Sequence, residues 1–384
     1  MKNKIEMIYL KYEHIAKSIF YAALTIELVI MMVGHSAFML PYRGRLTHVA
    51  FVLFGGKVLL TKYTKKEWAV IILLGMIGSV SYFSVDDEWV IRIIMMVVSS
   101  KGISLKTVIK YTFWMSLFGT IMIMGLSCFG IGGQMVDVRD YGRGAIEARW
   151  CLGFNHANNL HGTIWYVISL GLLTFRDKVR WYHGGILTLI NVMLYCLTIS
   201  RTGLIVTQLV IIAAMIYVYY PQMAKWNWIY ILGILGTIFC AGIGIYAVAF
   251  GVYGNVILEK MSTLLTGRLE LLTWWETVGE WSLFGDARER KPVDVGFITL
   301  VSRYGYVIFS LYLVCILLMI YYQCRNKQWM EFVVLMTCVF YTFMESTYTI
   351  NVYLLCNFTF LLLLGTWNRL LMKGRTDESI QSKK

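Results

Sequence analysis

The sequence is poor in charged residues and has no long polar segment. Asp, Glu, Lys and Arg make up 15% of the 384 residues, whereas hydrophobic residues make up 58% and the mean hydropathy is +0.64. Soluble domains contain only roughly 45–50% apolar residues. No polar stretch between the apolar runs is long enough to fold as a domain of its own. The composition therefore excludes a soluble protein and predicts an all-α polytopic membrane protein with one membrane-embedded domain.

The cysteines lack any spacing that is typical of a metal or redox site. The eight cysteines are scattered, most of them inside apolar runs, and none forms a Cys-x-x-Cys pair. We interpret them as packing residues and expect neither a metal nor another cofactor. Cys128 and Cys151 flank one of the segments expected outside the membrane, which leaves a disulfide between them open.

Apolar runs predict about 12 membrane spans, within a range of roughly 10–14, because a spanning helix needs about 20 apolar residues. The runs lie near residues 16–38, 46–61, 67–84, 89–100, 107–129, 160–175, 183–200, 202–220, 227–250, 295–321, 329–345 and 349–367. The second and fourth runs are short and contain Lys57 and Arg92. These two runs are therefore open to being tilted, broken or half-buried helices.

The net charge of +13 reflects orientation in the bilayer and predicts no nucleic-acid partner. Many lysines and arginines flank apolar runs, and most fall on the inner side when the N-terminus is placed in the cytoplasm. Both termini are therefore predicted to be cytoplasmic. In this scheme residues 1–15 form an interfacial segment, 16–367 the transmembrane domain and 368–384 a cytoplasmic tail.

Two outer segments are too long to be simple turns, at about residues 130–158 and 251–294. The second, between the ninth and tenth spans, has apolar residues at helical spacing from Ile257 to Val278. It predicts one amphipathic helix on the outer membrane surface. Cations on the outer side are mostly Arg, whereas those on the inner side are mostly Lys. Because the guanidinium group binds phosphate and carboxylate in a bidentate manner, an outer anion site is expected.

The stretch LGFNHANNLHG, residues 152–162, opens the sixth span with a cluster of uncharged polar groups, and Arg149 precedes it. Capping of the helix explains one asparagine, either Asn158 or Asn159. The cluster exceeds what one helix end needs, so it also predicts a polar site whose amides bind sugar hydroxyls. Its candidate residues are Arg149, Asn155, His156, Asn158, Asn159 and His161.

Three further arginines are candidates, two of them on the outer side and one within a span. Arg201 lies in a tight turn, where the alternative is simple snorkelling, and Arg268 follows Gly267, where the alternative is a solvated helix face. Arg303 lies two turns into the tenth span and needs a partner or an aqueous cavity. Asp294 and Glu345 are the partners available to it.

Both carboxylates have a structural and a functional interpretation. Glu345 ends the eleventh span and is either a structural partner of Arg303 or a substrate-binding group. Asp294 immediately precedes the tenth span. It is either an acidic helix cap or a carboxylate that orients or deprotonates an acceptor hydroxyl.

In this order, the motifs resemble those of the O-antigen ligase and Wzy-type polysaccharide polymerase superfamily, over about residues 130–325. The family pattern Gly-Phe-x-His-Pro-Asn matches residues 153–158 except that Ala157 replaces the proline. Its Ser-Arg matches Ser200 and Arg201, and its Gly-Arg matches Gly267 and Arg268. The ligase branch carries a catalytic histidine in the large loop, but residues 255–296 contain none. Asp294 followed by Gly296 and Phe297 resembles the polymerase branch instead.

The resemblance implies a GT-C-like glycosyltransferase of the bacterial cytoplasmic membrane, active on the extracytoplasmic side. Such a polymerase transfers the growing glycan from undecaprenyl pyrophosphate to a hydroxyl of the next lipid-linked repeat unit, without a metal, and a chain-length regulator is a possible partner. Arg201 and Arg268 would stabilise the leaving pyrophosphate, and Asp294 or His156 would be the base. The alternatives are a ligase-like transferase, a flippase with charges such as Arg92 along its path, and a receptor or scaffold without catalysis.

Overall fold

The protein is a helical membrane protein. The computed structural model describes residues 2–140, 146–265, 267–275, 280–287, 293–350, 355 and 357–381. Fourteen α-helices and one two-stranded sheet make up the longer regular elements of these residues. Six of the helices are long and apolar enough to cross a membrane, by length and composition. The larger number of spans expected from the sequence stays a prediction.

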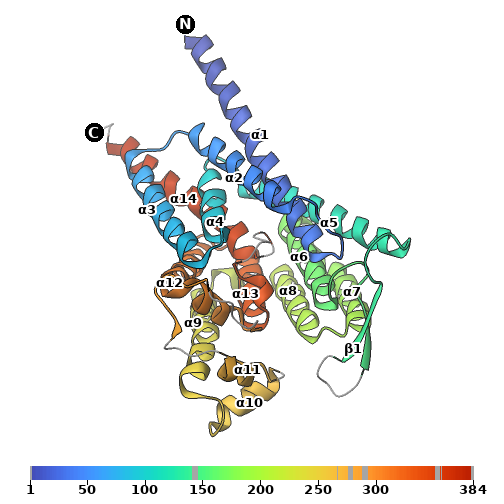
Figure 1. Cartoon of the computed structure of the whole chain (residues 1–384). Coiled ribbons are helices and arrows are strands. Elements are labelled where there is room, and N and C mark those ends of the chain that lie inside the picture. The colour runs from blue at the N-terminus through green and yellow to red at the C-terminus, as the bar shows by residue number, and fades with distance from the viewer. Residues whose placement is uncertain are drawn as a thin grey trace.

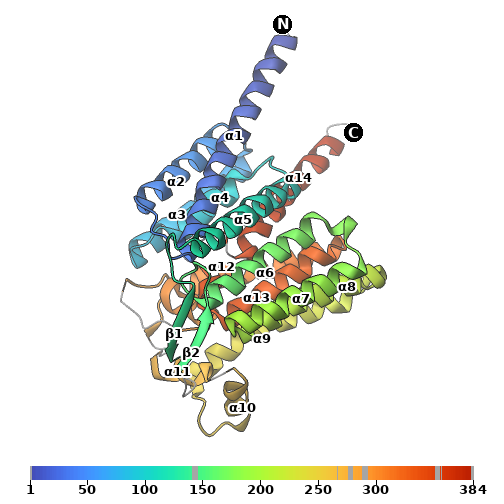
Figure 2. The same cartoon turned by 90° about the vertical axis from the view of Figure 1, so that its right-hand side faces the viewer.

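The first five helices form one part of the bundle (Figures 1 and 2). They are α1 (Lys2–His35), α2 (Arg43–Leu59), α3 (Lys65–Val85), α4 (Trp89–Ser99) and α5 (Leu105–Cys128). The start of α3 illustrates how the sequence sets an end: the Thr64 side chain accepts from the Glu67 N–H, and the Glu67 carboxylate accepts from the Thr64 N–H. This capping box satisfies two backbone donors that the first turn leaves unpaired.

The remaining long helices correspond closely to the predicted apolar runs. They are α6 (Ala157–Thr174), α7 (Trp181–Thr198), α8 (Arg201–Tyr219), α9 (Asn227–Phe250), α12 (Gly296–Arg325), α13 (Trp329–Met344) and α14 (Phe358–Gln381). Short 3-10 turns connect several of them, namely η1 (Arg176–Lys178), η2 (Pro221–Lys225) and η4 (Ser346–Tyr348). Figure 2 shows α6, α7, α8, α9 and α13 side by side, and α6 and α13 are buried over most of their length. The last apolar run was predicted to begin helically near residue 349, but α14 begins only at Phe358.

The two long segments expected outside the membrane contain regular structure that the sequence analysis missed. Residues 130–158 include the antiparallel strands β1 (Val136–Asp140) and β2 (Ile146–Trp150). The prediction of a single amphipathic helix in the second segment is wrong. Two helices replace it, α10 (Val256–Leu264) and α11 (Arg268–Trp275), because Gly267 adopts a φ of 79°, which a continuous helix cannot accommodate. Cys128 and Cys151 are free thiols, so the disulfide left open between them does not form.

The helix α12 is broken at Gly305, in its first half, where a loop docks onto it. Gly305 has a φ of 80°, and the amides of the next two residues, Tyr306 and Val307, donate to the carbonyls of Ser282 and Leu283 over 3.1 and 3.0 Å. The break therefore keeps its backbone hydrogen bonds by borrowing acceptors from residues 282–283. Gly285 packs so closely that a side chain there would meet the Arg303 carbonyl.

The two ends of the molecule differ in content. Figure 2 shows both chain termini at one end, and the β1–β2 hairpin with α10 and α11 at the other. The starts of α6, α8 and α12 follow the hairpin, the α7–α8 turn and the α10–α11 segment along the chain. The end of the molecule that carries the hairpin therefore also carries most of the candidate residues.

Candidate functional site

The start of α6 is capped by a histidine, not by an asparagine. His156 occupies the N-cap position with an extended backbone, and its Nδ1 accepts the Asn158 N–H over 3.0 Å. The expectation that Asn158 or Asn159 caps this helix is therefore wrong, because an imidazole nitrogen satisfies the backbone donor. The Asn158 side chain is thereby left to point elsewhere, and Asn159 is half-buried.

Four of the predicted site residues meet in one network at this helix start. The Asn158 amide donates to Glu345 Oε1 over 3.4 Å. The Arg268 guanidinium donates to the same Glu345 oxygen over 3.0 Å and also to the Met344 carbonyl. Arg268 Nε lies 3.5 Å from Asp294 Oδ2. The network thus joins α6, α11, the end of α13 and the residue pair before α12.

The two carboxylates around Arg268 differ in exposure. The Glu345 side chain is 13% exposed, whereas that of Asp294 is 53% exposed. Burial raises the pKa of Glu345 above its usual value, and the neighbouring Asp294 acts in the same direction, although Arg268 opposes both. Glu345 is therefore the inner, fixed partner of the arginine, and Asp294 is the outer partner that solvent can reach.

Arg303 is paired with an acid that the sequence analysis did not consider. Its Nε and Nη2 donate to Asp87 Oδ2 over 3.2 and 2.9 Å, and the Tyr304 hydroxyl donates to the same oxygen over 3.2 Å. The expectation that Asp294 or Glu345 partners Arg303 is wrong, because both carboxylates are engaged by Arg268. The signal for Asp87 in the sequence was an acidic turn, VDDE, between two predicted spans.

His161 is a buried structural residue in this conformation. Its Nδ1 lies 2.9 Å from the Thr198 hydroxyl and its Nε2 lies 3.0 Å from Asn191 Oδ1. The side chain has no exposed surface, and α8 can approach it only because residue 203 is glycine. His161 therefore links α6 to α7 and α8 and does not reach a substrate directly.

Arg201 does not join the Arg268 network. It is the first residue of α8 and is exposed, and Ser200 caps this helix by accepting from the Gly203 N–H over 3.4 Å. Within the described residues, no hydrogen bond or ion pair of the Arg201 guanidinium is present. The start of α8 touches α6 where Gly203 packs against His161. Arg268 is linked to the same helix, α6, through Glu345 and Asn158. The two arginines therefore lie near one helix but do not contact each other in the described structure.

Two further candidates hold the β-hairpin and the start of α6 in place. Arg149 makes a bidentate contact with Glu147 Oε2, from Nε over 2.9 Å and from Nη2 over 2.6 Å. The Asn155 amide donates to the Gly34 carbonyl over 3.0 Å and thereby ties this segment to the end of α1. Both side chains were predicted to bind substrate, but in the structure each makes a contact within the protein.

An aromatic cluster lies under the polar network. The rings of Tyr341 and Tyr348 are 4.1 Å apart, and Trp165 packs on Tyr341 with a centroid distance of 4.9 Å. A side chain at Gly162 would overlap the Tyr348 hydroxyl. This tight packing holds the end of α13 and the turn η4 against α6 and therefore fixes Glu345, which lies between them.

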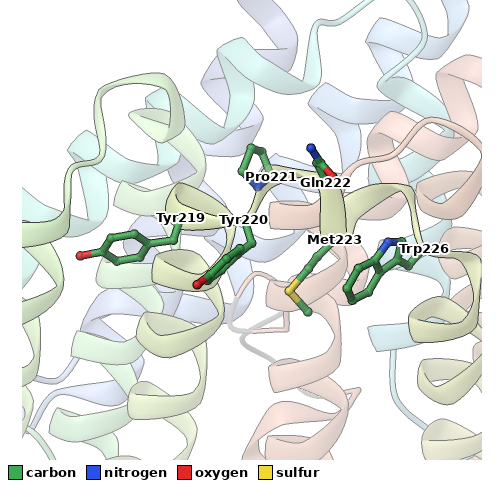
Figure 3. Close-up of a pocket in the computed structure, with 6 residues that line it drawn as sticks. All are labelled: Tyr219, Tyr220, Pro221, Gln222, Met223 and Trp226. Carbon is green, nitrogen blue, oxygen red and sulfur yellow. The ribbon is translucent and has the colours of Figure 1, made fainter.

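The described residues contain no group of three or more His, Cys, Asp or Glu side chains that could hold a metal ion. A pocket of about 270 Å³ lies elsewhere, at the far end of α8 from Arg201 (Figure 3). Figure 3 shows its lining from Tyr219 to Trp226, which comes from the end of α8 and the turn before α9. This lining contains no carboxylate, histidine, lysine or arginine.

The chain was compared with protein-family models, curated proteins and solved structures. No family model, curated protein or solved structure matches it. A functional assignment therefore depends on the motifs and on the geometry of the Arg268 network.

Proposed function

We propose that the protein is a membrane glycan polymerase that joins lipid-linked oligosaccharide repeat units on the outer face of the bacterial cytoplasmic membrane. The growing glycan would leave undecaprenyl pyrophosphate and be transferred to a hydroxyl of the next lipid-linked unit. The observation that carries this proposal is the meeting of Arg268, Asp294 and Glu345 beside the polar start of α6. A cation and an exposed carboxylate side by side supply the two groups that the reaction requires.

Cleavage of the bond between sugar and pyrophosphate places negative charge on the leaving phosphate and positive charge on the sugar ring. Arg268 would stabilise the phosphate. Glu345, nearly buried, keeps the guanidinium in place, whereas the exposed Asp294 is the partner that an incoming phosphate can replace. The proposed role of Glu345 is thus to position the arginine and that of Arg268 is to bind the leaving group.

Asp294 is the preferred base for the acceptor hydroxyl. Once phosphate replaces it at Arg268, its carboxylate is available to accept the hydroxyl proton as the new glycosidic bond forms. His156 is less suited to this role because its Nδ1 already accepts the hydrogen bond that caps α6. Asn158 and Asn159 would bind sugar hydroxyls at the mouth of the same site. Arg201, exposed at the start of α8, would add positive charge when the substrate is bound.

The test is polymerisation by the purified full-length protein in lipid nanodiscs. With synthetic lipid-linked repeat units of the correct sugar sequence, the unmodified protein should produce a ladder of longer glycans. Arg268→Ala and Asp294→Ala should each reduce the rate by at least about 100-fold, which is the usual cost of losing a charge-stabilising or acid–base group. Arg325→Ala, at the opposite end of α12, is the matched control and should keep the ladder. A ladder that survives both site substitutions would overturn the proposal.

Two alternatives make different predictions in the same assay. A ligase-like transferase would add a single finished glycan to a different acceptor and form no ladder. A flippase would move the lipid-linked unit across the bilayer and would depend on charges within the spans. The buried pair of Arg92 and Glu27, with a 2.7 Å contact, is the observation that favours this second alternative.

A further inference from the structure

The proposed reaction consumes two lipid-linked molecules, and each of them carries a diphosphate. A polymerase therefore needs two anion-binding positions at the same end of the molecule. The Arg268 network supplies one of them. The inference that follows rests on the proposed function and concerns the second position.

Arg303 is held by a nearly buried acid. Asp87 is 7% exposed, and one of its oxygens accepts from Nε and Nη2 of Arg303 and from the Tyr304 hydroxyl. Two nitrogens on one edge of the guanidinium are thus bound to a single carboxylate. This arrangement fixes the plane of the group and leaves Nη1 directed away from the acid.

The rest of the Arg303 side chain is accessible. It is 50% exposed, although it lies in an apolar helix, about 10 Å from the first residue of α12 at 1.5 Å per residue. No partner for Nη1 is found among the residues that the structure describes. A charge at this depth must face water, a headgroup or a bound anion, because exposure to hydrocarbon is costly.

The backbone around Arg303 is fixed by the docked loop. The helix breaks at Gly305, directly after Tyr304, and Gly285 packs against the Arg303 carbonyl. The Tyr304 hydroxyl also contacts the Ile350 carbonyl over 3.3 Å. The arginine therefore sits on a rigid support made of three separate segments, which is what a preorganised binding group requires.

Arg268 and Tyr304, the residue after Arg303, contact the two ends of one chain segment, residues 344–350. Arg268 contacts Met344 and Glu345 at its beginning, and the Arg303–Tyr304 pair reaches Ile350 at its end. The two arginines share no carboxylate among the described residues. We propose that Arg303, positioned by Asp87, binds the diphosphate of the second lipid-linked substrate, so that both carriers are held next to residues 345–350.

The test counts bound carriers by native mass spectrometry of the full-length protein, with undecaprenyl pyrophosphate as the probe. The unmodified protein should bind two molecules, and Arg303→Ala and Arg268→Ala should each bind one. Arg325→Ala, which removes an exposed arginine from the same helix, should still bind two. Two molecules bound to the Arg303→Ala protein at the same affinities would overturn the proposal.

Asp87 is a positioning residue, and a conservative substitution tests this role. Asp87→Asn should weaken binding of the second carrier by at least 10-fold, and Asp87→Glu should restore part of it, because a carboxylate is retained. Melting midpoints measured on the same samples separate lost binding from misfolding. Equal second-carrier affinities for the Asn and Glu variants would contradict the positioning role.

Competition decides which phosphate the position accepts. Undecaprenyl pyrophosphate should be displaced from it by inorganic pyrophosphate at high concentration but not by phosphatidylglycerol. Equal displacement by phosphatidylglycerol would assign Arg303 to bulk lipid headgroups and overturn the second-substrate site.

The outcomes of the two assays distinguish this inference from the proposed function. A protein that binds two carriers but makes no ladder would contradict only the polymerase reaction. If the unmodified protein makes a ladder but Arg303→Ala leaves the affinity for the second carrier unchanged, only this inference is contradicted.

Discussion

At the scale of single residues, the Arg268 network depends on one buried carboxylate with a raised pKa. Glu345 is nearly enclosed, and burial disfavours its charged form more than Arg268 favours it. The folded protein therefore holds a proton on Glu345 more tightly than the unfolded chain does. Folding takes up this proton at pH values between the usual glutamate pKa of 4.5 and the raised one.

The pH dependence of stability follows from that sign. In unmodified protein, the contribution of Glu345 to the free energy of unfolding should be greatest below pH 4.5 and should fall as the pH rises through the raised pKa. Glu345→Gln should remove this contribution and flatten the curve. Melting midpoints followed by tryptophan fluorescence across this pH range check the prediction. A Gln variant with the same slope as the unmodified protein would contradict it.

The buried pair of Glu27 and Arg92 gives a second prediction at this scale. Each side chain is 2% exposed, and the pair joins α1 to α4. Removing one member of such a pair leaves an uncompensated buried charge, at a cost of about 3–5 kcal/mol. Arg92→Met alone should therefore destabilise the protein more than Arg92→Met combined with Glu27→Leu. Unfolding free energies of the two single variants and the double variant complete the cycle, and simple additivity would argue against a coupled pair.

Sequence patterns identified several residues of the candidate site but predicted the wrong partner for Arg303. The Asn-rich start of α6, Arg268, Asp294 and Glu345 were all candidates, and the structure brings these positions together. The partner of Arg303 was missed because Asp87 is more than 200 positions away in the chain. A charged residue in a span indicates that a partner is needed, but the identity of that partner depends on which helices pack together.

At the scale of elements, the break in helix α12 is the feature that holds Arg303 in position. Gly305 and Gly285 both have positive φ values, near 80°, and their backbones approach closely. Any side chain at either position meets backbone atoms of the other segment. The break therefore depends on two glycines that are separated in the sequence but touch in the fold.

Substitution of these glycines should separate the loop from the helix. Gly305→Ala and Gly285→Ala should each destabilise the protein by roughly 1–3 kcal/mol, because they add a strained backbone conformation to a steric clash. Gly242→Ala, on α9, is the matched control, since a side chain there meets no neighbour. Melting midpoints of the three variants provide the comparison. Equal stability of all three would contradict the docking of residues 282–285 onto α12.

The helices themselves followed from apolar length, whereas their interruptions did not. Every predicted apolar run coincides with a helix, apart from the late start of α14 at Phe358. The break between α10 and α11 falls at Gly267, where the amphipathic pattern continues without a visible stop. The hairpin β1–β2 was also missed. Backbone geometry at Gly267 decided the break between α10 and α11, and hydrophobic periodicity does not report it.

At the scale of the whole molecule, the two ends are chemically different. The termini lie at one end, and the hairpin with α10 and α11 lies at the other (Figure 2). Lysines are concentrated on segments predicted to be cytoplasmic. The positive-inside rule therefore predicts that the Arg268 network lies on the extracytoplasmic side of the membrane.

This orientation is testable by labelling single cysteines in intact cells. In a variant without native cysteines, Tyr253→Cys should react with a membrane-impermeant maleimide, because it lies on the end with the hairpin and is 63% exposed. Asp177→Cys, on the turn η1 at the other end, should react only after the cells are permeabilised. Reaction of the Asp177→Cys protein in intact cells would contradict the predicted orientation.

Composition and the apolar runs determined that this chain is a helical membrane protein. Within a membrane, the backbone N–H and C=O groups of such a run have no water to bind, and a helix pairs them with each other. Sequence order also determined where most helices begin and end. Only the tertiary structure decided which charges meet: Arg268 with Glu345 and Asp294, and Arg303 with Asp87. Such pairings depend on the packing of helices distant in sequence, and no local pattern carries that information.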